Sequence, residues 1–254
     1  IELPGIKEPE RVRKLLQGSA NLEFWETYDL AEILPQISQI NNEFAAQNAS
    51  TEAAQAEAAP AKEEAKAEAE VEDELDALVE DLAADSLAQA EADQEAALEE
   101  YKKANPLFAV LNPSVSPAGQ PYQGPVVGTV HYTDTAKVMA MLNSQVAKTV
   151  LPRELRLCWT VKAIDEAESF YQLVALKSQT NGRPSLEGDV ITDARADFGQ
   201  TSAYANVSMT MNAEGARDWQ RITRDNIGKS IAIVLDGYVY SFPTVQNEIA
   251  GGSS

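Results

Sequence analysis

One histidine and one cysteine are the residues of this chain that could carry nucleophilic chemistry. His131 lies in an expected strand, 27 residues before Cys158. Catalysis by this pair would need the thiol within hydrogen-bond reach of a base that a third group orients. The pattern favours packing or edge positions for both residues. A single cysteine also excludes an intrachain disulfide and a cysteine-rich zinc site.

Carboxylates are too abundant in this chain for a pair of them to indicate an acid and base. Asp165, Glu166 and Glu168 fall in an expected turn, where charge keeps the turn solvated. The chain contains no phosphate-binding string of the G-x-G-x-x-G or P-loop type. We therefore expect no enzyme activity, no catalytic residue, no metal site and no cofactor.

The net charge of -20 is concentrated in one segment. Residues 52–103 hold 18 acids against four lysines, a net charge of -14, and the rest of the chain carries -6. Because the basic residues are scattered among more numerous acids, no basic face is available to neutralise phosphates, which excludes nucleic acid as a partner. The longest apolar runs resemble IAIVL at 231–235, far short of the roughly 20 residues that cross a bilayer.

The N-terminal region predicts a strand at 1–3, a helix at 9–18 and a strand at 20–28 with one apolar face. An amphipathic helix follows at 29–46, with Asp29 as a possible N-cap and Pro35 as a kink. The acidic segment combines 17 alanines with its 18 acids. Such a composition buries little apolar surface, so 47–70 is expected to be a flexible linker. Apolar spacing resumes at Val71 and predicts a helix over 71–103, about 50 Å long. We favour packing of its apolar face on the 29–46 helix over coiled-coil pairing.

The remaining patterns predict a strand at 107–111, a Pro/Gly-rich loop through Gly124 and a strand at 126–132. A helix capped by Thr133 or Asp134 runs to Pro152, and strands follow at 155–164 and 169–178. The C-terminal part predicts strands at 191–198 and 205–211, a helix at 213–226 and a hairpin turning at Asp236-Gly237. The chain begins at Ile1 without Met and stops at GGSS, so we expect a segment of a longer protein.

Strand-helix-strand order at both ends is typical of a split β-α-β repeat, as in a ferredoxin-like sheet. The expected fold class is α+β, in three parts. A ferredoxin-like base comprises 1–28 and 189–254, an acidic helical insertion comprises 29–104, and an α+β head comprises 105–188.

Long strings near both ends resemble, in order, motifs of the SecD family of Sec-translocon accessory membrane proteins. They are IELPGIKEPERVRKLLQGSANLEFWETY at 1–28, LEGDVITDARADF at 186–198 and MNAEGARDWQRITRDNIGKSIAIVLDGYVYSFPTVQNEIAGG at 211–252. The resemblance implies a large periplasmic loop between the first two membrane helices of SecD, or of a fused SecD-SecF protein. The proton-carrying residues of that family lie in membrane helices, so none is assigned to this chain.

The resemblance also implies a location on the periplasmic side of the bacterial inner membrane. The implied partners are unfolded preprotein and, through the membrane part of the parent protein, SecF and a SecYEG-type translocon. The leading hypothesis is a domain that binds emerging preprotein and moves as a hinge to help complete export driven by the proton gradient. The alternative is a structural module whose acidic helical arm docks another translocon or envelope protein without binding substrate.

A domain that handles unfolded chains without reading their sequence needs an apolar groove and exposed strand edges. Apolar or amphipathic residues near the Pro/Gly-rich loop are the candidate contacts for preprotein, and the chain segments that join head and base are the candidate hinges. The candidate contacts are Phe108, Val110, Tyr122, Val126, Tyr132 and Met141, and the candidate hinge residues are Asn105, Pro106, Gly188 and Asp189.

Overall fold

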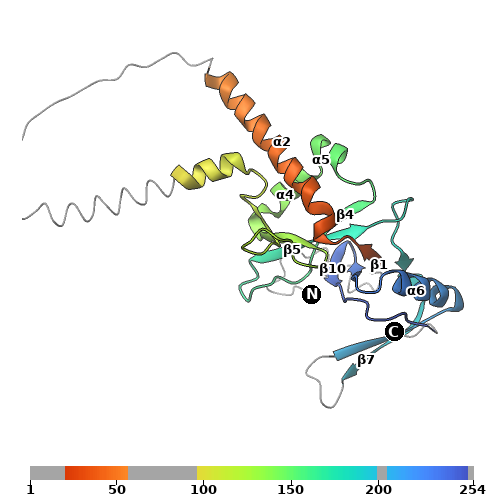
Figure 1. Ribbon diagram of the computed structural model, residues 1–254. Helices are drawn as coiled ribbons and strands as arrows, with labels where there is room; N and C mark the ends of the chain where they lie inside the picture. The colour runs from red at the N-terminus through yellow and green to blue at the C-terminus, as the bar shows by residue number, and fades with distance from the viewer. Residues whose placement is uncertain (1–20, 57–95, 199–204, 251–254) are drawn as a thin grey trace, which may run out of the picture. The chain divides into compact units, whose positions relative to one another are not determined.

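The computed structural model describes residues 21–56, 96–198 and 205–250 (Figure 1). The strand expected at 1–3, the helix expected at 9–18 and most of the acidic segment lie outside these residues. The chain divides into two compact units. One is formed by Ile1–Ile37 with Asn112–Ser254, and the other by Ser38–Leu111. The fold is mixed α and β with an antiparallel sheet, as the sequence predicted at that level.

An eight-stranded sheet with the order β10-β9-β1-β5-β3-β2 organises the first unit, with β4 paired to β5 and β6 paired to β1. Strand β1 lies in its interior, antiparallel to β9 on one side and to β5 and β6 on the other. The strands are β1 (Leu22–Thr27), β2 (Leu111–Pro113), β3 (Val126–His131), β4 (Leu155–Trp159), β5 (Phe170–Lys177), β6 (Leu186–Glu187), β9 (Ile231–Leu235) and β10 (Tyr238–Ser241).

Both faces of β1 are buried, which corrects the prediction of a single apolar face. Phe24 is fully buried on one face and Trp25 is 4% exposed on the other. Successive side chains of a strand point to opposite faces of the sheet. Each face of β1 is covered by its own group of buried side chains. Phe24 belongs to a core with Met211, Trp219 and Ile222, whereas Trp25 belongs to a second core with Leu176 and Val234.

Helix α6 (Ala213–Asp225) and the β9–β10 hairpin confirm the predictions for the C-terminal region. The side chain of Asn212 caps α6 by accepting a hydrogen bond from the Gly215 backbone N–H at 2.8 Å. The hairpin turns at Asp236 and Gly237, whose φ angles of 50° and 84° are left-handed. Two left-handed residues are what a two-residue hairpin turn requires, which explains the Asp-Gly pair.

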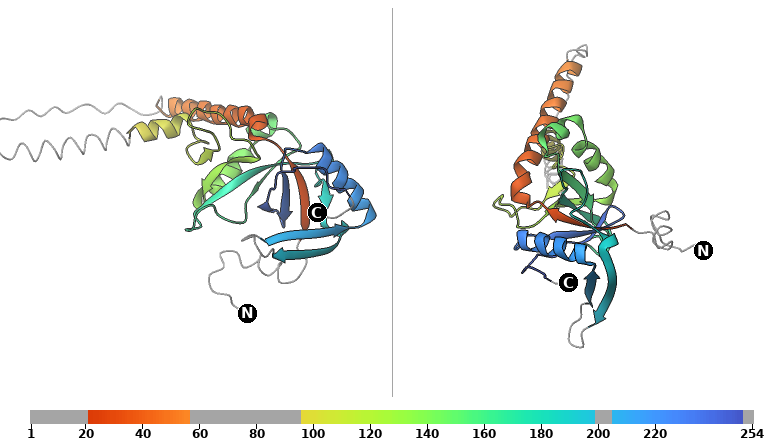
Figure 2. Two further views of the ribbon diagram at one scale, coloured as in Figure 1. Left: turned by 60° about the horizontal axis from the view of Figure 1, so that its bottom comes forward. Right: turned by 90° about the vertical axis from the view of Figure 1, so that its right-hand side faces the viewer.

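Strands β7 (Ile191–Phe198) and β8 (Ala205–Met211) form a separate two-stranded sheet. The views in Figures 1 and 2 show this hairpin meeting α6 at one end of the helix and projecting away from it. The strands flanking α6 therefore lie in different sheets, β8 in the small one and β9 in the large one. Within the described residues β8 and β9 do not share one sheet, and the ferredoxin-like base stays a prediction.

The predicted boundary between head and base runs through the large sheet. Strand β1, from the predicted base, pairs with β5, from the predicted head, through Glu26 with Lys177 and Thr27 with Leu176. Residues 112–254 also fall in one compact unit. Any motion between the predicted head and base would therefore act across a shared sheet.

The strand predicted at 107–111 is wrong, because residues 106–110 form turns and β2 starts only at Leu111. The side-chain oxygen of Asn41 accepts hydrogen bonds from the backbone N–H groups of Leu107 (3.1 Å) and Phe108 (3.3 Å). The N–H of Leu111 donates to the Leu107 carbonyl at 2.9 Å, which closes a helical turn. A side chain far away in the sequence thus decides this local structure.

The helix predicted from Thr133 or Asp134 to Pro152 is interrupted. A short 3-10 turn, η1 (Tyr132–Asp134), precedes α4 (Thr135–Leu142), and α5 (Gln145–Val150) is a separate helix. The Asp134 side chain makes no capping bond. Ser144, by contrast, caps α5 by accepting from the Ala147 N–H at 3.2 Å, and so starts a new helix.

Helix α2 (Leu30–Ala56) extends ten residues beyond the predicted end at 46 and contains Pro35. Its later part is rich in alanine, and no glycine interrupts it, so nothing in the sequence ends the helix at 46. Residues 96–104 are also helical, which confirms the C-terminal end of the predicted helix over 71–103. The rest of that helix lies outside the described residues.

Candidate functional site

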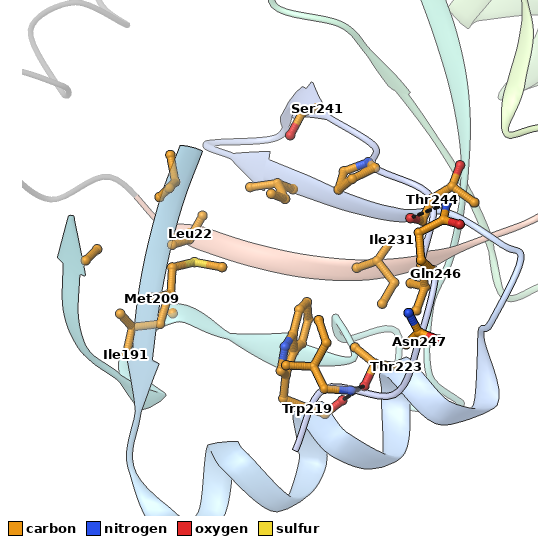
Figure 3. A pocket seen from close by; sticks show the side chains of 17 residues that line it. Leu22, Ile191, Met209, Trp219, Thr223, Ile231, Ser241, Thr244, Gln246 and Asn247 are labelled. Carbon is orange, nitrogen blue, oxygen red and sulfur yellow. Dashed lines mark hydrogen bonds between the residues drawn. The ribbon is translucent and has the colours of Figure 1, made fainter. Parts of the chain in front are cut away.

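An apolar groove of about 840 Å³ opens on the Phe24 face of the large sheet, within the first unit (Figure 3). We call it the α6 groove. Its floor consists of Leu22 from β1 and of Ile231 and Ile233 from β9. These residues come together because β1 and β9 are antiparallel neighbours, with Leu22 opposite Leu235 and Phe24 opposite Ile233.

Helix α6 forms one wall of the groove with Trp219 and Thr223. The buried face of α6 contains Gly215, Trp219, Ile222 and Thr223, which is helical spacing. Gly215 allows the helix to approach closely, because a Cβ at this position would lie 2.5 Å from the Val190 Cβ. The close approach of the helix to the turn that contains Val190 therefore depends on this glycine.

Trp219 is 5% exposed and packs edge-on against Phe24, with ring centroids 5.1 Å apart. No acceptor among the described residues lies within hydrogen-bond reach of its indole Nε1. Buried indole N–H groups usually have a partner. The indole N–H of Trp219 is therefore a buried donor without a partner among the described residues.

The chain after β10 forms the rim of the groove and is tied to α6. Thr223 is fully buried. Its hydroxyl donates to the Trp219 carbonyl at 2.8 Å and accepts from the Ile249 N–H at 3.0 Å. On the surface, Gln220 donates a hydrogen bond to Glu248. These bonds hold the segment at 245–249 in place as a wall of the groove.

The β7–β8 hairpin closes the opposite side with Ile191, Ala194, Val207 and Met209. Val207 is 60% exposed, a high value for a valine beside an apolar groove. The polar lining comes from neutral side chains, namely Ser241, Thr244, Gln246 and Asn247. Val207 therefore presents an exposed apolar side chain at the edge of the groove.

No ionisable side chain is among the described residues that line the α6 groove. Proton transfer and nucleophilic attack need such groups within reach. In the part of the chain that the structure describes, no group of three or more histidine, cysteine or acidic side chains could hold a metal ion. Across the same residues, no helix has the length and hydropathy of a membrane span.

His131 and Cys158 do not meet. Both strands that carry them pair with β5, His131 opposite Phe170 and Cys158 opposite Val174. The His131 Nδ1 lies 2.8 Å from the Thr133 hydroxyl. Burial raises the pKa of the Cys158 thiol to about 11, and a protonated thiol is a poor nucleophile.

None of the six predicted contact residues lines the α6 groove. Phe108 and Val110 belong to the unit Ser38–Leu111, where both are half-buried in the turn after residue 104. In the other unit, Tyr122 and Tyr132 are 58% and 51% exposed, and Met141 is half-buried in α4. Val126 lines a cavity of about 260 Å³ together with Gly228, Ser230 and Phe242.

The predicted hinge residues are held by specific contacts. The Asn105 side-chain oxygen accepts a hydrogen bond from the buried Asn41 amide at 3.2 Å, and Pro106 follows directly. Gly188 starts the 3-10 turn η2 (Gly188–Val190), and Asp189 is exposed in that turn. A Cβ at Gly188 would lie 2.8 Å from the Leu22 Cβ, so the turn packs closely on β1.

The sequence interpretation missed the α6 groove because the residues that line it come from parts of the chain that are far apart in the sequence. One signal was present in the sequence. Gly215, Trp219 and Thr223 are spaced four residues apart, which places them on one face of a helix and indicates that this face is buried. The positions of the β7–β8 hairpin and of the segment at 245–249 have no comparable local signal.

Comparisons with known proteins agree with the resemblance read from the sequence. Residues 166–254 match the family model described as the SecDF P1 head subdomain. This match, like the large sheet, runs across the boundary predicted at 188. The chain is 36% identical over 268 residues to protein translocase subunit SecD of Rhodothermus marinus, covering 100% of this chain and 36% of that protein. It is 44% identical over 79 residues to SecDF of Thermus thermophilus, covering 31% and 11%.

Two solved SecDF structures each match 29% of this chain, with 46% sequence identity over the matched part. One, described as a membrane component that enhances protein export, has a TM-score of 0.26 and is covered to 33%. The other, the translocon-associated SecDF of Thermus thermophilus, has a TM-score of 0.27 and is covered to 10%. The chain spans about a third of the length of the Rhodothermus relative.

Proposed function

Because the chain belongs to the SecD/SecDF family of protein translocase subunits, we propose that it serves protein export by binding unfolded polypeptide in the α6 groove. The observation that carries the proposal is the groove itself, which is apolar, open on one side and without ionisable groups. Apolar side chains of different shapes can be buried in such a groove, so it suits a ligand whose sequence varies.

The physical basis is removal of apolar surface from water, worth about 25 cal/mol per Å². An export substrate exposes such surface before it folds. The neutral polar side chains in the lining support a polypeptide over a purely hydrocarbon ligand, because every peptide unit presents an N–H and a carbonyl oxygen that can pair with such groups. Affinity would then depend on the backbone and on apolar content more than on a particular sequence.

The proposal includes the predicted contact residues as further places where preprotein touches the domain. These are Phe108, Val110, Tyr122, Val126, Tyr132 and Met141. It also includes a ferredoxin-like base and hinge motion at Asn105–Pro106 and Gly188–Asp189. The shared sheet favours a motion that bends at these joints over one that separates two independent domains.

In the parent protein, the domain would lie on the periplasmic side of the inner membrane. It would act with SecF and a SecYEG-type translocon through the membrane part. We propose no catalytic reaction for it.

Site-specific photo-crosslinking tests the proposed binding. Val207 lines the α6 groove and is 60% exposed, whereas Ile227 is 54% exposed and lies outside it. A photoreactive residue at 207 should form an adduct with a stalled export substrate, and one at 227 should not. Equal adducts at both positions, or none at 207, would contradict binding in the groove.

The acidic segment favours a second function, a structural module in which the predicted helical arm docks another translocon or envelope protein. Its net charge of -14 over residues 52–103 is the supporting observation. Comparing the chain with and without residues 47–104 in pull-downs separates the two functions. Loss of folded envelope proteins with retention of unfolded polypeptide would assign docking to the arm and substrate binding to the rest.

A further inference from the structure

Three large side chains are exposed together at the ends of β3 and β5, outside the α6 groove. Tyr132 is 51% exposed, Ile164 is 55% exposed and Phe170 is 43% exposed. The half-buried His131 lies among them. We call these four residues the aromatic patch.

The backbone holds the aromatic patch in place. His131 and Phe170 are cross-strand partners in the sheet, and their rings meet edge to face with centroids 5.3 Å apart. The ring of Tyr132 lies 4.7 Å from that of His131. The Ile164 N–H donates to the Phe170 carbonyl at 2.9 Å, so Ile164 is fixed beside Phe170. Exposed rings held by a sheet lose little conformational entropy when a ligand binds.

Acidic groups surround this patch. Asp165, Glu166 and Glu168 occupy the turn between Ile164 and Phe170, and Asp134 follows Tyr132 by two residues. Hydrogen bonds from the backbone N–H groups of Phe170 and Ser169 lower the pKa of Asp165, which keeps this carboxylate charged. The basic residues nearest in sequence, Lys137 and Lys162, are outnumbered.

We propose that the aromatic patch binds segments of unfolded polypeptide in which lysine or arginine alternates with apolar residues. A cation over an aromatic face gains from the ring's negative charge distribution, and the surrounding carboxylates add long-range attraction. The same carboxylates repel acidic peptides, anionic lipids and nucleic acids. The inference depends on the proposed function for the nature of the ligand, but it places a second contact away from the α6 groove and gives that contact a charge preference.

The test uses the 254-residue chain and two labelled unstructured peptides with the same apolar residues. One peptide carries lysines, and the other carries glutamate in place of each lysine. By fluorescence anisotropy at low salt, the lysine peptide should bind about tenfold more tightly, a difference typical of a few charge contacts. Added salt should remove most of that preference.

Substitutions assign the preference to the patch. Tyr132→Ser combined with Phe170→Ser should weaken binding of the lysine peptide about fivefold to tenfold. Tyr240→Ser is the matched control, because Tyr240 is also 43% exposed and lies on β10 in the same unit. Glu166→Gln combined with Glu168→Gln leaves every ring in place and should reduce the salt dependence. This second variant keeps the test valid if loss of the rings disturbs folding.

The outcomes separate this inference from the proposed function. If the patch variants bind the lysine peptide like wild type while Ile233→Ala in the α6 groove weakens both peptides, the patch proposal is overturned and groove binding stands. An equal loss in Tyr240→Ser would also overturn the patch. If wild type binds neither peptide, both proposals fail.

Discussion

The two faces of the large sheet are built from alternate residues of the same strands, yet they differ in what covers them. On β9, Ile231 and Ile233 point to the face with α6, where the groove opens. Ala232 and Val234 point to the other face and pack with Trp25 and Leu176 in a closed core. Neighbouring residues on one strand therefore line an open groove on one side and a closed core on the other.

The two buried tryptophans show the same difference. Arg156 lies over the Trp25 ring at 5.6 Å, and the Trp25 indole N–H donates to Glu23 at 2.9 Å. Trp219 has no such acceptor among the described residues. A buried donor without a partner costs free energy that a paired donor does not, so the two faces differ in polar pairing as well as in what covers them. The following predictions test this division, from the largest expected effect to the smallest.

Trp219→Ala should cause the largest loss of stability. Removal of a buried indole leaves a cavity against Phe24 and should cost about 3–5 kcal/mol in the free energy of unfolding, measured by urea denaturation. Trp219→Phe keeps most of the packing and removes only the indole N–H. It should retain most of the stability and the peptide affinity, because the indole N–H is buried. A clear loss of peptide affinity in Trp219→Phe would show that the ligand reaches this donor.

Val234→Ala and Ile233→Ala form a matched pair on adjacent positions of β9. Val234 is 1% exposed in the closed core, so its truncation should cost about 2 kcal/mol in unfolding free energy and leave peptide affinity unchanged. Ile233 is half-buried in the groove floor, so its truncation should cost less stability but weaken peptide binding. The division between the faces fails if both variants lose affinity to the same degree.

Gly215→Ala probes how closely α6 must approach to form the groove. The added methyl group would meet the Val190 Cβ at 2.5 Å, and the overpacking should cost about 1–3 kcal/mol in the free energy of unfolding. The higher helix propensity of alanine, about 1 kcal/mol, partly offsets this cost. Thermal unfolding measures the net change. Val190→Ala in the same chain makes room for the methyl group and should restore stability. No rescue would mean that the helix is not limited by this contact.

Cys158 gives the smallest effect and reports on the closed face. Its thiol pKa is raised from 9.0 to about 11, so the folded state retains the proton more tightly than the unfolded state. This contribution to stability is complete below about pH 9 and declines as the pH rises to about 11. At pH 8 the native thiol should react with iodoacetamide roughly a hundredfold more slowly than in the denatured chain, because less thiolate is present. Equal rates would show that this face is open.

Local chemistry made much of the fold predictable. The Asn212 cap, the Asp236-Gly237 turn and the helical face with Trp219 each depend on residues within a few positions of one another, and all three were identifiable in the sequence. The family was also recognisable from long strings at both ends of the chain. None of these features required knowledge of which strands pair.

The failures involve interactions between distant parts of the chain. The turn at 106–110 depends on Asn41, 66 residues before Leu107, and no local pattern reveals that hydrogen bond. The predicted contact residues, chosen for apolar character near a loop, stay a prediction. The α6 groove was not predicted, because it collects β1, β9, α6, the β7–β8 hairpin and the segment at 245–249, whose apolar faces become adjacent only after the strands pair.

The sequence by itself determined the family, the charge distribution and the elements whose caps and turns are local. Only the tertiary structure decided that both faces of β1 are buried, that one of them opens into a groove, and that Tyr132 and Phe170 lie together. The reason is physical: caps and turns are satisfied by neighbours along the chain, whereas burial and exposure depend on which distant segments cover each face.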